Sequence, residues 1–115
     1  MNAVNNAVTD KIKVRVTSYN PEVAQNDKSP CIGAHGTNVC ELARNGIKLI
    51  AVSRDLRKKF PYGTMARVES DNQSIAGCYQ VEDTMNARFK KRIDLFFLTR
   101  KENQGGYAFI SNNCN

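Results

Sequence analysis

Alternation of apolar and polar residues is the clearest pattern along the chain. Between Lys11 and Tyr19 the apolar residues Ile12, Val14 and Val16 share one face, and basic residues occupy the other. A period of two residues predicts a half-buried β-strand. Shorter apolar or alternating runs, separated by turn residues, predict further strands over residues 47–52, 63–69, 75–81, 93–98 and 107–110.

Six short strands with almost no helical periodicity predict a small all-β barrel. Residues 56–60 read as a brief helical or turn segment, and residues 93–98 are apolar enough to be buried on both faces. Two prolines and two glycines make residues 20–37 a long loop, and loops of unequal length favour a topology more tangled than an up-and-down meander. We expect residues 1–10 to be a flexible lead-in and residues 11–115 to form one domain.

The balance of charge predicts an anionic partner. The chain carries 17 Lys and Arg against 11 Asp and Glu, a formal net charge of +6. Nucleic acid is one such partner, but Trp is absent and no aromatic–basic alternation of the RNA-binding type occurs. The bacterial wall, with its lactyl-peptide carboxylates, fits the charge equally well. Charge alone does not choose between them.

The four cysteines fit no zinc spacing, because the chain has no CxxC pair and His35 is its one histidine. An even count in a small domain favours an exported, oxidised protein with up to two disulfides; four reduced thiols in the cytosol are the alternative. Pairing Cys31 with Cys40 would close a short ring, and Cys78 with Cys114 would then hold the C-terminal tail to the barrel. Three pairings are possible, and the sequence selects none of them.

Membrane insertion is not expected, because no apolar run is long enough to cross a bilayer. The first six residues lack the apolar core of a signal peptide. A secreted or cell-envelope location would therefore use a signal that has been removed or another route, such as phage lysis.

Two aspartates fall in successive predicted strands. Asp83 ends one apolar run, Asp94 lies inside the next, and a basic loop from Arg88 to Arg92 joins them. Aspartate is a poor strand residue and is costly to bury unpaired, so the pair suggests a site rather than a scaffold. The alternatives are a solvated turn residue for Asp83 and a structural carboxylate, bonded to backbone amides or Arg92, for Asp94. Strand alternation turns the preceding residue, Glu82, to the opposite face.

Short motifs in order along the chain resemble those of the three-aspartate domain. The matching segments are VTSY at 16–19, SPCIGAHGT at 29–37, LIAVS at 49–53, FPYGT at 60–64, VEDT at 81–84 and RIDL at 92–95. This domain is a double-psi β-barrel found in the catalytic part of the membrane-bound lytic transglycosylase A family and in small stationary-phase and resuscitation-type muralytic proteins. The resemblance covers roughly residues 14–98 and implies a six-stranded double-psi β-barrel with long loops.

Two parts of the chain depart from the family pattern. Ser53 stands where the family has its first aspartate, and Asp55 follows two positions later. A shift of two residues in an extended strand keeps a side chain on the same face, so Asp55 either substitutes for that aspartate or caps the short segment after it. Met85 and Asn86 replace two family glycines and would narrow the cleft beside Asp83.

The resemblance implies a peptidoglycan lytic transglycosylase, which cleaves between N-acetylmuramic acid and N-acetylglucosamine without water and leaves a 1,6-anhydro product. One carboxylic acid would protonate the leaving oxygen and then accept the proton of the 6-hydroxyl, which requires a raised pKa. The family role makes Asp83 the expected acid/base, with Asp94 tuning or orienting it and Asp55 a candidate third member. The expected substrate-binding residues are Thr17, Tyr19, Thr84, Asn86 and Arg92, although Tyr19 fits core packing equally well.

A non-catalytic, expansin-like module that binds wall glycan through the same groove is the alternative, and a basic nucleic-acid-binding barrel is supported by net charge alone. The basic residues 88–92 either bind stem-peptide carboxylates or are simply solvated. The expected partner is the peptidoglycan glycan strand, with no nucleic acid, metal or cofactor. The protein is expected to be a monomer.

Overall fold

All six strands expected from the alternation are present in the computed structural model, which describes residues 11–19, 31–32, 36–96 and 106–114. The strands lie within a few residues of their predicted positions. The elements, in chain order, are β1 (Ile12–Tyr19), α2 (Val39–Arg44), β2 (Leu49–Val52), the 3₁₀ segment η1 (Arg54–Leu56), β3 (Met65–Glu69), β4 (Gly77–Thr84), β5 (Arg92–Phe96) and β6 (Gly106–Ser111).

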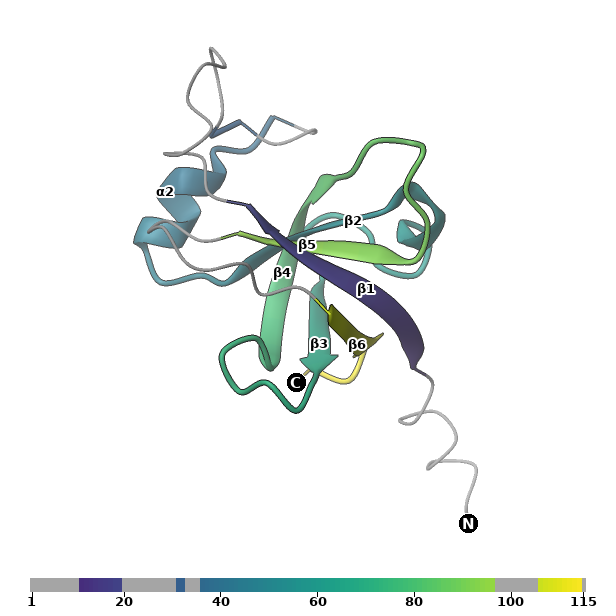
Figure 1. Ribbon diagram of the computed structural model, residues 1–115. Coiled ribbons are helices and arrows are strands. Elements are labelled where there is room, and N and C mark those ends of the chain that lie inside the picture. The colour runs from purple at the N-terminus through teal and green to yellow at the C-terminus, as the bar shows by residue number, and fades with distance from the viewer. Residues whose placement is uncertain (1–10, 20–30, 33–35, 97–105, 115) are drawn as a thin grey trace.

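The six strands close into one barrel in the order β1-β5-β2-β4-β3-β6, shown in Figure 1. β1 runs parallel to β5 and β2 runs parallel to β4, whereas the other four neighbouring pairs are antiparallel. Parallel neighbours require crossover connections rather than hairpins, so strands distant in the sequence lie side by side. The prediction of a small all-β barrel is therefore confirmed, and its mixed topology is compatible with a double-psi barrel.

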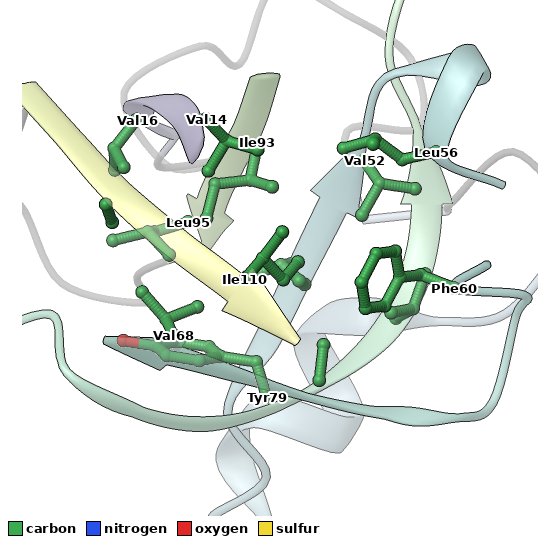
Figure 2. Close-up of a cluster of buried hydrophobic side chains, with 14 of the residues drawn as sticks. Val14, Val16, Val52, Leu56, Phe60, Val68, Tyr79, Ile93, Leu95 and Ile110 are labelled. Carbon is green, nitrogen blue, oxygen red and sulfur yellow. The ribbon is translucent and has the colours of Figure 1, made fainter. Parts of the chain in front are cut away.

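The core fills the inside of the barrel and is almost entirely aliphatic (Figure 2). Every strand contributes alternate residues to it, among them Val14 from β1 and Ile93 and Leu95 from β5, each at most 1% exposed. Tyr79 is also buried in this cluster, and its hydroxyl donates a hydrogen bond of 2.8 Å to the carbonyl oxygen of Ile75. Because the inward positions are occupied by core residues, any site on these strands must lie on the outer face of the barrel.

α2 was not predicted, although its first turn carries a recognisable start signal. The side chain of Asn38 accepts a hydrogen bond of 3.0 Å from the backbone amide of Glu41. Asn at the N-cap followed three residues later by Glu is a common helix start, and Gly46, with φ of +89°, follows the last turn. Val39 is buried beneath this short helix. A search for caps, rather than for periodicity, would have found it.

Two disulfides join the four cysteines in one of the three pairings that the sequence allows. Cys31–Cys40 attaches the segment 31–32 to α2, with a Cα–Cα distance of 5.1 Å. Cys78–Cys114 attaches the C-terminal segment to β4, with a Cα–Cα distance of 6.1 Å. This chemistry is consistent with an oxidising compartment outside the cytosol.

The structure also corrects two local predictions. Residues in β5 alternate between buried and partly exposed, so the strand expected over 93–98 is not buried on both faces. The segment expected over 56–60 begins earlier, as a 3₁₀ turn at Arg54. The expected lead-in, 1–10, and His35 lie outside the described residues. Among the described elements, no helix is long and apolar enough to cross a membrane.

Candidate functional site

Asp83 and Asp94 belong to one row of residues that crosses four neighbouring strands. Thr17 in β1 pairs with Asp94 in β5, Asp94 pairs with Ala51 in β2, and Ala51 pairs with Asp83 in β4. Residues paired across a sheet project from the same face. The row lies on the outer face, because the residues flanking Asp94 in β5 are buried in the core. Two strand spacings separate the two aspartates, which puts their Cα atoms about 10 Å apart.

Ala51 lies between the two aspartates, and its small side chain leaves the space between them open. A residue with a long side chain at this position would separate the carboxyl groups. Because strand pairing sets the row, the two aspartates are held by backbone hydrogen bonds on three strands rather than by a loop. The strand pairing therefore holds the two aspartates rigidly on one face of the barrel; that they form a functional site stays a prediction.

Asp94 is partly buried, and its surroundings favour the protonated form of its carboxyl group. Burial raises the pKa of the Asp94 carboxyl above its usual range, and the charge of Asp83 acts in the same direction. Thr17 Oγ1 donates a hydrogen bond of 2.9 Å to Asp94 Oδ1, and both this bond and the charge of Arg92 act against the rise. The net effect is a carboxylic acid that keeps its proton to higher pH than an exposed aspartate.

A β-bulge in β4 brings a third carboxyl group to the same place. Ile50 pairs with Val81, but the next residue, Ala51, pairs with Asp83, so Glu82 is an extra residue in β4. An extra residue breaks the alternation of faces. The expectation that Glu82 points away from Asp83 is therefore wrong, because the two side chains line the same recess.

Glu82 is only 4% exposed. Gln80 Nε2 donates a hydrogen bond of 2.5 Å to Glu82 Oε2, which supplies part of the pairing that a buried carboxyl group requires. Next to it, Asp83 Oδ1 accepts a hydrogen bond of 2.8 Å from the amide of Thr84, which fixes the Asp83 side chain against its own strand. Bulges cannot be read from a single sequence, so no signal short of the register identifies Glu82.

The recess between these groups is small, with a volume of about 30 Å³. That volume suits one or two water molecules and is far too small to enclose a sugar ring. The rings of Tyr19 and Phe96 meet edge to face beside it, with centroids 5.9 Å apart. A saccharide would therefore lie across the mouth of the recess rather than inside it. The described residues that line the recess are Tyr19, Val39, Leu49, Ile50, Ala51, Glu82, Asp83, Asp94 and Phe96.

Ser53 and Asp55 lie outside this recess. Ser53 is fully buried; its Oγ accepts a hydrogen bond of 3.0 Å from the amide of Arg92, and its own amide donates to the Arg92 carbonyl oxygen. Asp55 Oδ2 accepts a hydrogen bond of 3.0 Å from the amide of Lys91, a residue with φ of +45°. Both residues thus hold the chain just before Asp94.

The protonation of Asp55 also differs from that of Asp94. Partial burial acts to raise the pKa of Asp55, but hydrogen bonds from Ser53 and from the amides of Lys91 and Asp55, with the charge of Lys90, outweigh it and lower that pKa below its usual range. The structure therefore gives Asp55 a structural position, bonded to Lys91 rather than capping residues 56–60, and does not bring it into the row with Asp83.

The remaining expected binding residues are dispersed around the site. The hydroxyl groups of Thr84 and Tyr62 are hydrogen bonded to each other. Asn86 is exposed, and its Oδ1 accepts a hydrogen bond of 3.0 Å from the amide of Arg88 in a turn. The guanidinium of Arg92 lies over the ring of Phe89, 4.4 Å from the centroid. None of these side chains lines the recess. Of the other two expected binding residues, Thr17 belongs to the row and Tyr19 lines the recess.

Within the described part of the chain, no three His, Cys, Asp or Glu side chains come together as a metal site. No protein-family model matches the chain, and no curated protein is significantly similar to it. Functional inference for this protein therefore depends on the geometry and chemistry of the row formed by Thr17, Asp94, Ala51 and Asp83.

Proposed function

We propose that the protein is a cell-wall glycan-cleaving enzyme, a lytic transglycosylase acting on peptidoglycan. The observation that carries the proposal is the half-buried Asp94, whose pKa is raised by burial and by the neighbouring Asp83 on an open outer face. General-acid cleavage of a glycosidic bond requires a carboxylic acid that carries its proton at the working pH, and a raised pKa acts in that direction.

In this mechanism Asp94 performs the proton transfers. It donates its proton to the leaving glycosidic oxygen as the bond from the anomeric carbon of N-acetylmuramic acid breaks. The 6-hydroxyl of the same sugar then attacks that carbon, and its proton passes to Asp94, which restores the acid. Thr17 Oγ1 donates a hydrogen bond to Oδ1 of the Asp94 carboxyl group, and we assign the proton transfers to Oδ2. This assignment exchanges the roles expected from the family pattern, in which Asp83 was the acid/base.

Asp83 supplies the second function that such a reaction needs. A glycosyl transition state resembles an oxocarbenium ion, and a nearby carboxylate stabilises its positive charge. Asp83 lies on the same face as Asp94, separated from it by Ala51 alone along the row. The same carboxylate favours the protonated form of Asp94 before the reaction. One residue thus both prepares the acid and stabilises the transition state.

Shape and charge support the proposed substrate class. The recess is too small for a sugar ring but is open to the outer face, so an extended polymer can lie across it. The net charge of +6 favours a polymer that carries carboxylates, as the stem peptides of peptidoglycan do. The two disulfides agree with a protein that works in the cell envelope or outside the cell.

Digestion of purified peptidoglycan sacculi, followed by mass spectrometry, tests the proposal. We expect 1,6-anhydromuramyl products from the wild-type protein. The variants Asp94→Asn and Asp83→Asn should lower the rate about a hundredfold or more, which is the size of a general-acid contribution. Glu41→Gln, an exposed carboxylate on α2 that does not line the recess, is the matched control and should cleave normally. Products with ordinary reducing ends would instead identify a hydrolase.

A second candidate function is a non-catalytic module that binds wall glycan. The observation that favours it is the replacement of the first family aspartate by Ser53, together with the engagement of Asp55 by the Lys91 amide. The site then holds two of the three family aspartates. Binding of the wild-type protein to sacculi with no released product would support this second function and contradict the first.

A further inference from the structure

A second surface, on the far half of β1, combines aromatic rings with basic side chains. Tyr107 and Phe109 in β6 are 61% and 43% exposed, although both are large and apolar or amphipathic. Lys13 pairs with Phe109 and Arg15 pairs with Tyr107 across the β1–β6 ladder. The ammonium of Lys13 lies 5.1 Å from the centroid of the Tyr107 ring. Exposed aromatic rings of this kind mark binding surfaces more often than isolated surface residues do.

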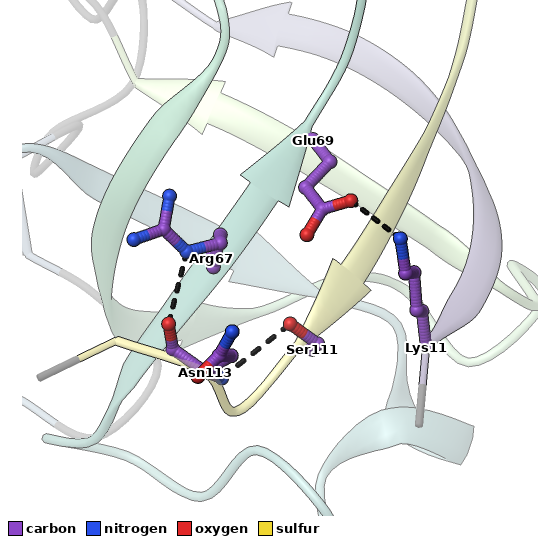
Figure 3. Close-up of polar contacts among 5 residues, drawn as sticks. All are labelled: Lys11, Arg67, Glu69, Ser111 and Asn113. Carbon is purple, nitrogen blue, oxygen red and sulfur yellow. Dashed lines mark hydrogen bonds and ion pairs between the residues drawn. The ribbon is translucent and has the colours of Figure 1, made fainter. Parts of the chain in front are cut away.

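This surface borders a groove of about 420 Å³ between β6 and the turn after β3. Figure 3 shows one of its walls, where Lys11 and Glu69 form an ion pair of 2.7 Å. Lys11 also lies over the Phe109 ring, 5.9 Å from its centroid. The groove is large enough for a sugar ring, unlike the recess at Asp94.

β1 connects this groove to the row of aspartates. Its outward-facing residues are Lys11, Lys13, Arg15, Thr17 and Tyr19, because the alternate positions turn toward the core. The strand begins beside β6 and ends near α2 (Figure 1). Eight residue steps in an extended strand span about 26 Å, so the groove and the row lie at opposite ends of one continuous outward face.

We propose that the outer face of β1 is an extended binding track for the glycan strand, with the groove at Tyr107 and Phe109 as a remote subsite. This proposal rests on the proposed function, since it names the part of the protein that holds the same polymer away from the cleavage point. The aromatic rings pack against the C–H-rich faces of sugar rings, and the exposed ammonium and guanidinium groups of Lys13 and Arg15 bind stem-peptide carboxylates.

The mixture of charges selects a glycan over a nucleic acid. Lys11 is already paired with Glu69, and Asp71 also lines the groove. A phosphodiester chain carries a negative charge at every residue, and sites that bind it are uniformly positive. Two carboxylates in the groove would repel such a chain. A glycan strand carries its carboxylates only on the side groups, which can reach Lys13 while the sugars lie over the rings.

Binding to purified sacculi tests the track directly, with the Asp94→Asn substitution present in every protein so that no cleavage interferes. We expect Tyr107→Ala with Phe109→Ala to weaken binding about tenfold or more, as expected for the loss of two aromatic anchors. Lys13→Gln should weaken binding at low salt and have less effect at high salt. Lys58→Gln, the same change of charge at an exposed lysine of the η1 turn, is the control and should bind normally.

A second measurement separates this proposal from the proposed function. In the presence of Asp94, the double aromatic variant should cleave a short soluble muropeptide at the wild-type rate, because that substrate cannot reach the groove. Sacculus binding that is unchanged by the aromatic substitutions would overturn the track whatever the enzyme does. Binding of fluorescent oligothymidylate that is as tight as binding to sacculi, and is lost in the same variants, would overturn it in favour of a nucleic acid. Loss of turnover in Asp94→Asn alone bears on the function and leaves the track intact.

Should the double variant fail to fold, as judged by circular dichroism, Lys13→Gln and Tyr107→Ser replace it. Tyr107 is mostly exposed, so its truncation leaves the core unchanged. Normal binding by both of these single variants would overturn the proposal.

Discussion

Replacing Thr17 by valine tests the proposed protonation of Asp94 through folding stability. Valine has nearly the same shape but removes the hydroxyl that donates to Asp94 Oδ1 at 2.9 Å. A hydrogen bond to a charged group contributes about 1.5–3 kcal/mol and one between neutral groups about 0.5–1.5 kcal/mol. Both side chains are only partly buried, so we use the lower end of each range. Thr17→Val should then lower the free energy of unfolding by about 1.5 kcal/mol when Asp94 is ionised and by about 0.5 kcal/mol when it is protonated.

The direction of the pH dependence follows from the raised pKa of Asp94. The pKa of the Asp94 carboxyl group is higher in the folded state than its ordinary value of 3.8. Such a group stabilises the folded state at pH values below 3.8, and this stabilisation is lost as the pH rises through the folded-state pKa. The Thr17 bond lowers this pKa, so Thr17→Val raises it further. The stability difference between wild type and variant should therefore grow from acid to neutral pH.

Urea unfolding followed by circular dichroism, at about pH 3 and about pH 7, measures this difference. The alkaline limb of the cleavage rate should move to higher pH in the same variant. Thr64→Val is the matched control, because Thr64 Oγ1 donates to the Pro61 carbonyl oxygen at 2.6 Å and has no carboxyl partner. A loss of stability in Thr17→Val that is the same at both pH values would refute the protonation argument.

Three further predictions concern stability. Asp94→Asn should raise the free energy of unfolding at neutral pH, because it removes a desolvated charge, and the gain should vanish below the ordinary aspartate pKa; thermal unfolding across pH measures both. Replacing both Cys78 and Cys114 by serine opens a loop with a sequence separation of 36, which should cost about 4 kcal/mol in urea unfolding. Tyr79→Phe should cost about 1 kcal/mol, because it leaves a buried carbonyl oxygen without its donor. Tyr107→Phe, at an exposed ring, should cost nothing measurable, and an equal loss at both tyrosines would contradict the reasoning.

The strands were predictable because their signal is local. Alternation in β1 follows from which side chains can face an apolar interior, and it requires no knowledge of the neighbouring strands. Turn residues such as the Asp71-Asn72 pair marked the ends of β3 and β4 for the same reason. α2 was not predicted because six residues are too few to show the helical period of 3.6 in their apolar positions, although its N-cap residue, Asn38, is visible in the sequence.

The site was only partly predictable. The sequence singled out Asp83 and Asp94, and the pairing register puts both on one face beside Ala51. Strict alternation predicted that Glu82 points away from Asp83, whereas the bulge in β4 puts both residues on the same face. The family pattern predicts that Asp83 carries the proton, whereas the raised pKa of Asp94 is the basis for the exchanged roles proposed above. Burial depends on what packs nearby, and no local pattern records it.

The sequence by itself determined the number of strands and their inward faces, and it singled out Asp83 and Asp94, since each follows from the preference of a side chain for water or an apolar interior. Only the tertiary structure decided which strands are neighbours. That choice aligned Thr17 with Asp94, and it paired Arg15, on the basic face of β1, with Tyr107, more than ninety positions away along the chain. The physical reason is that strand register depends on pairing between distant segments, whose free energy no local window of sequence contains.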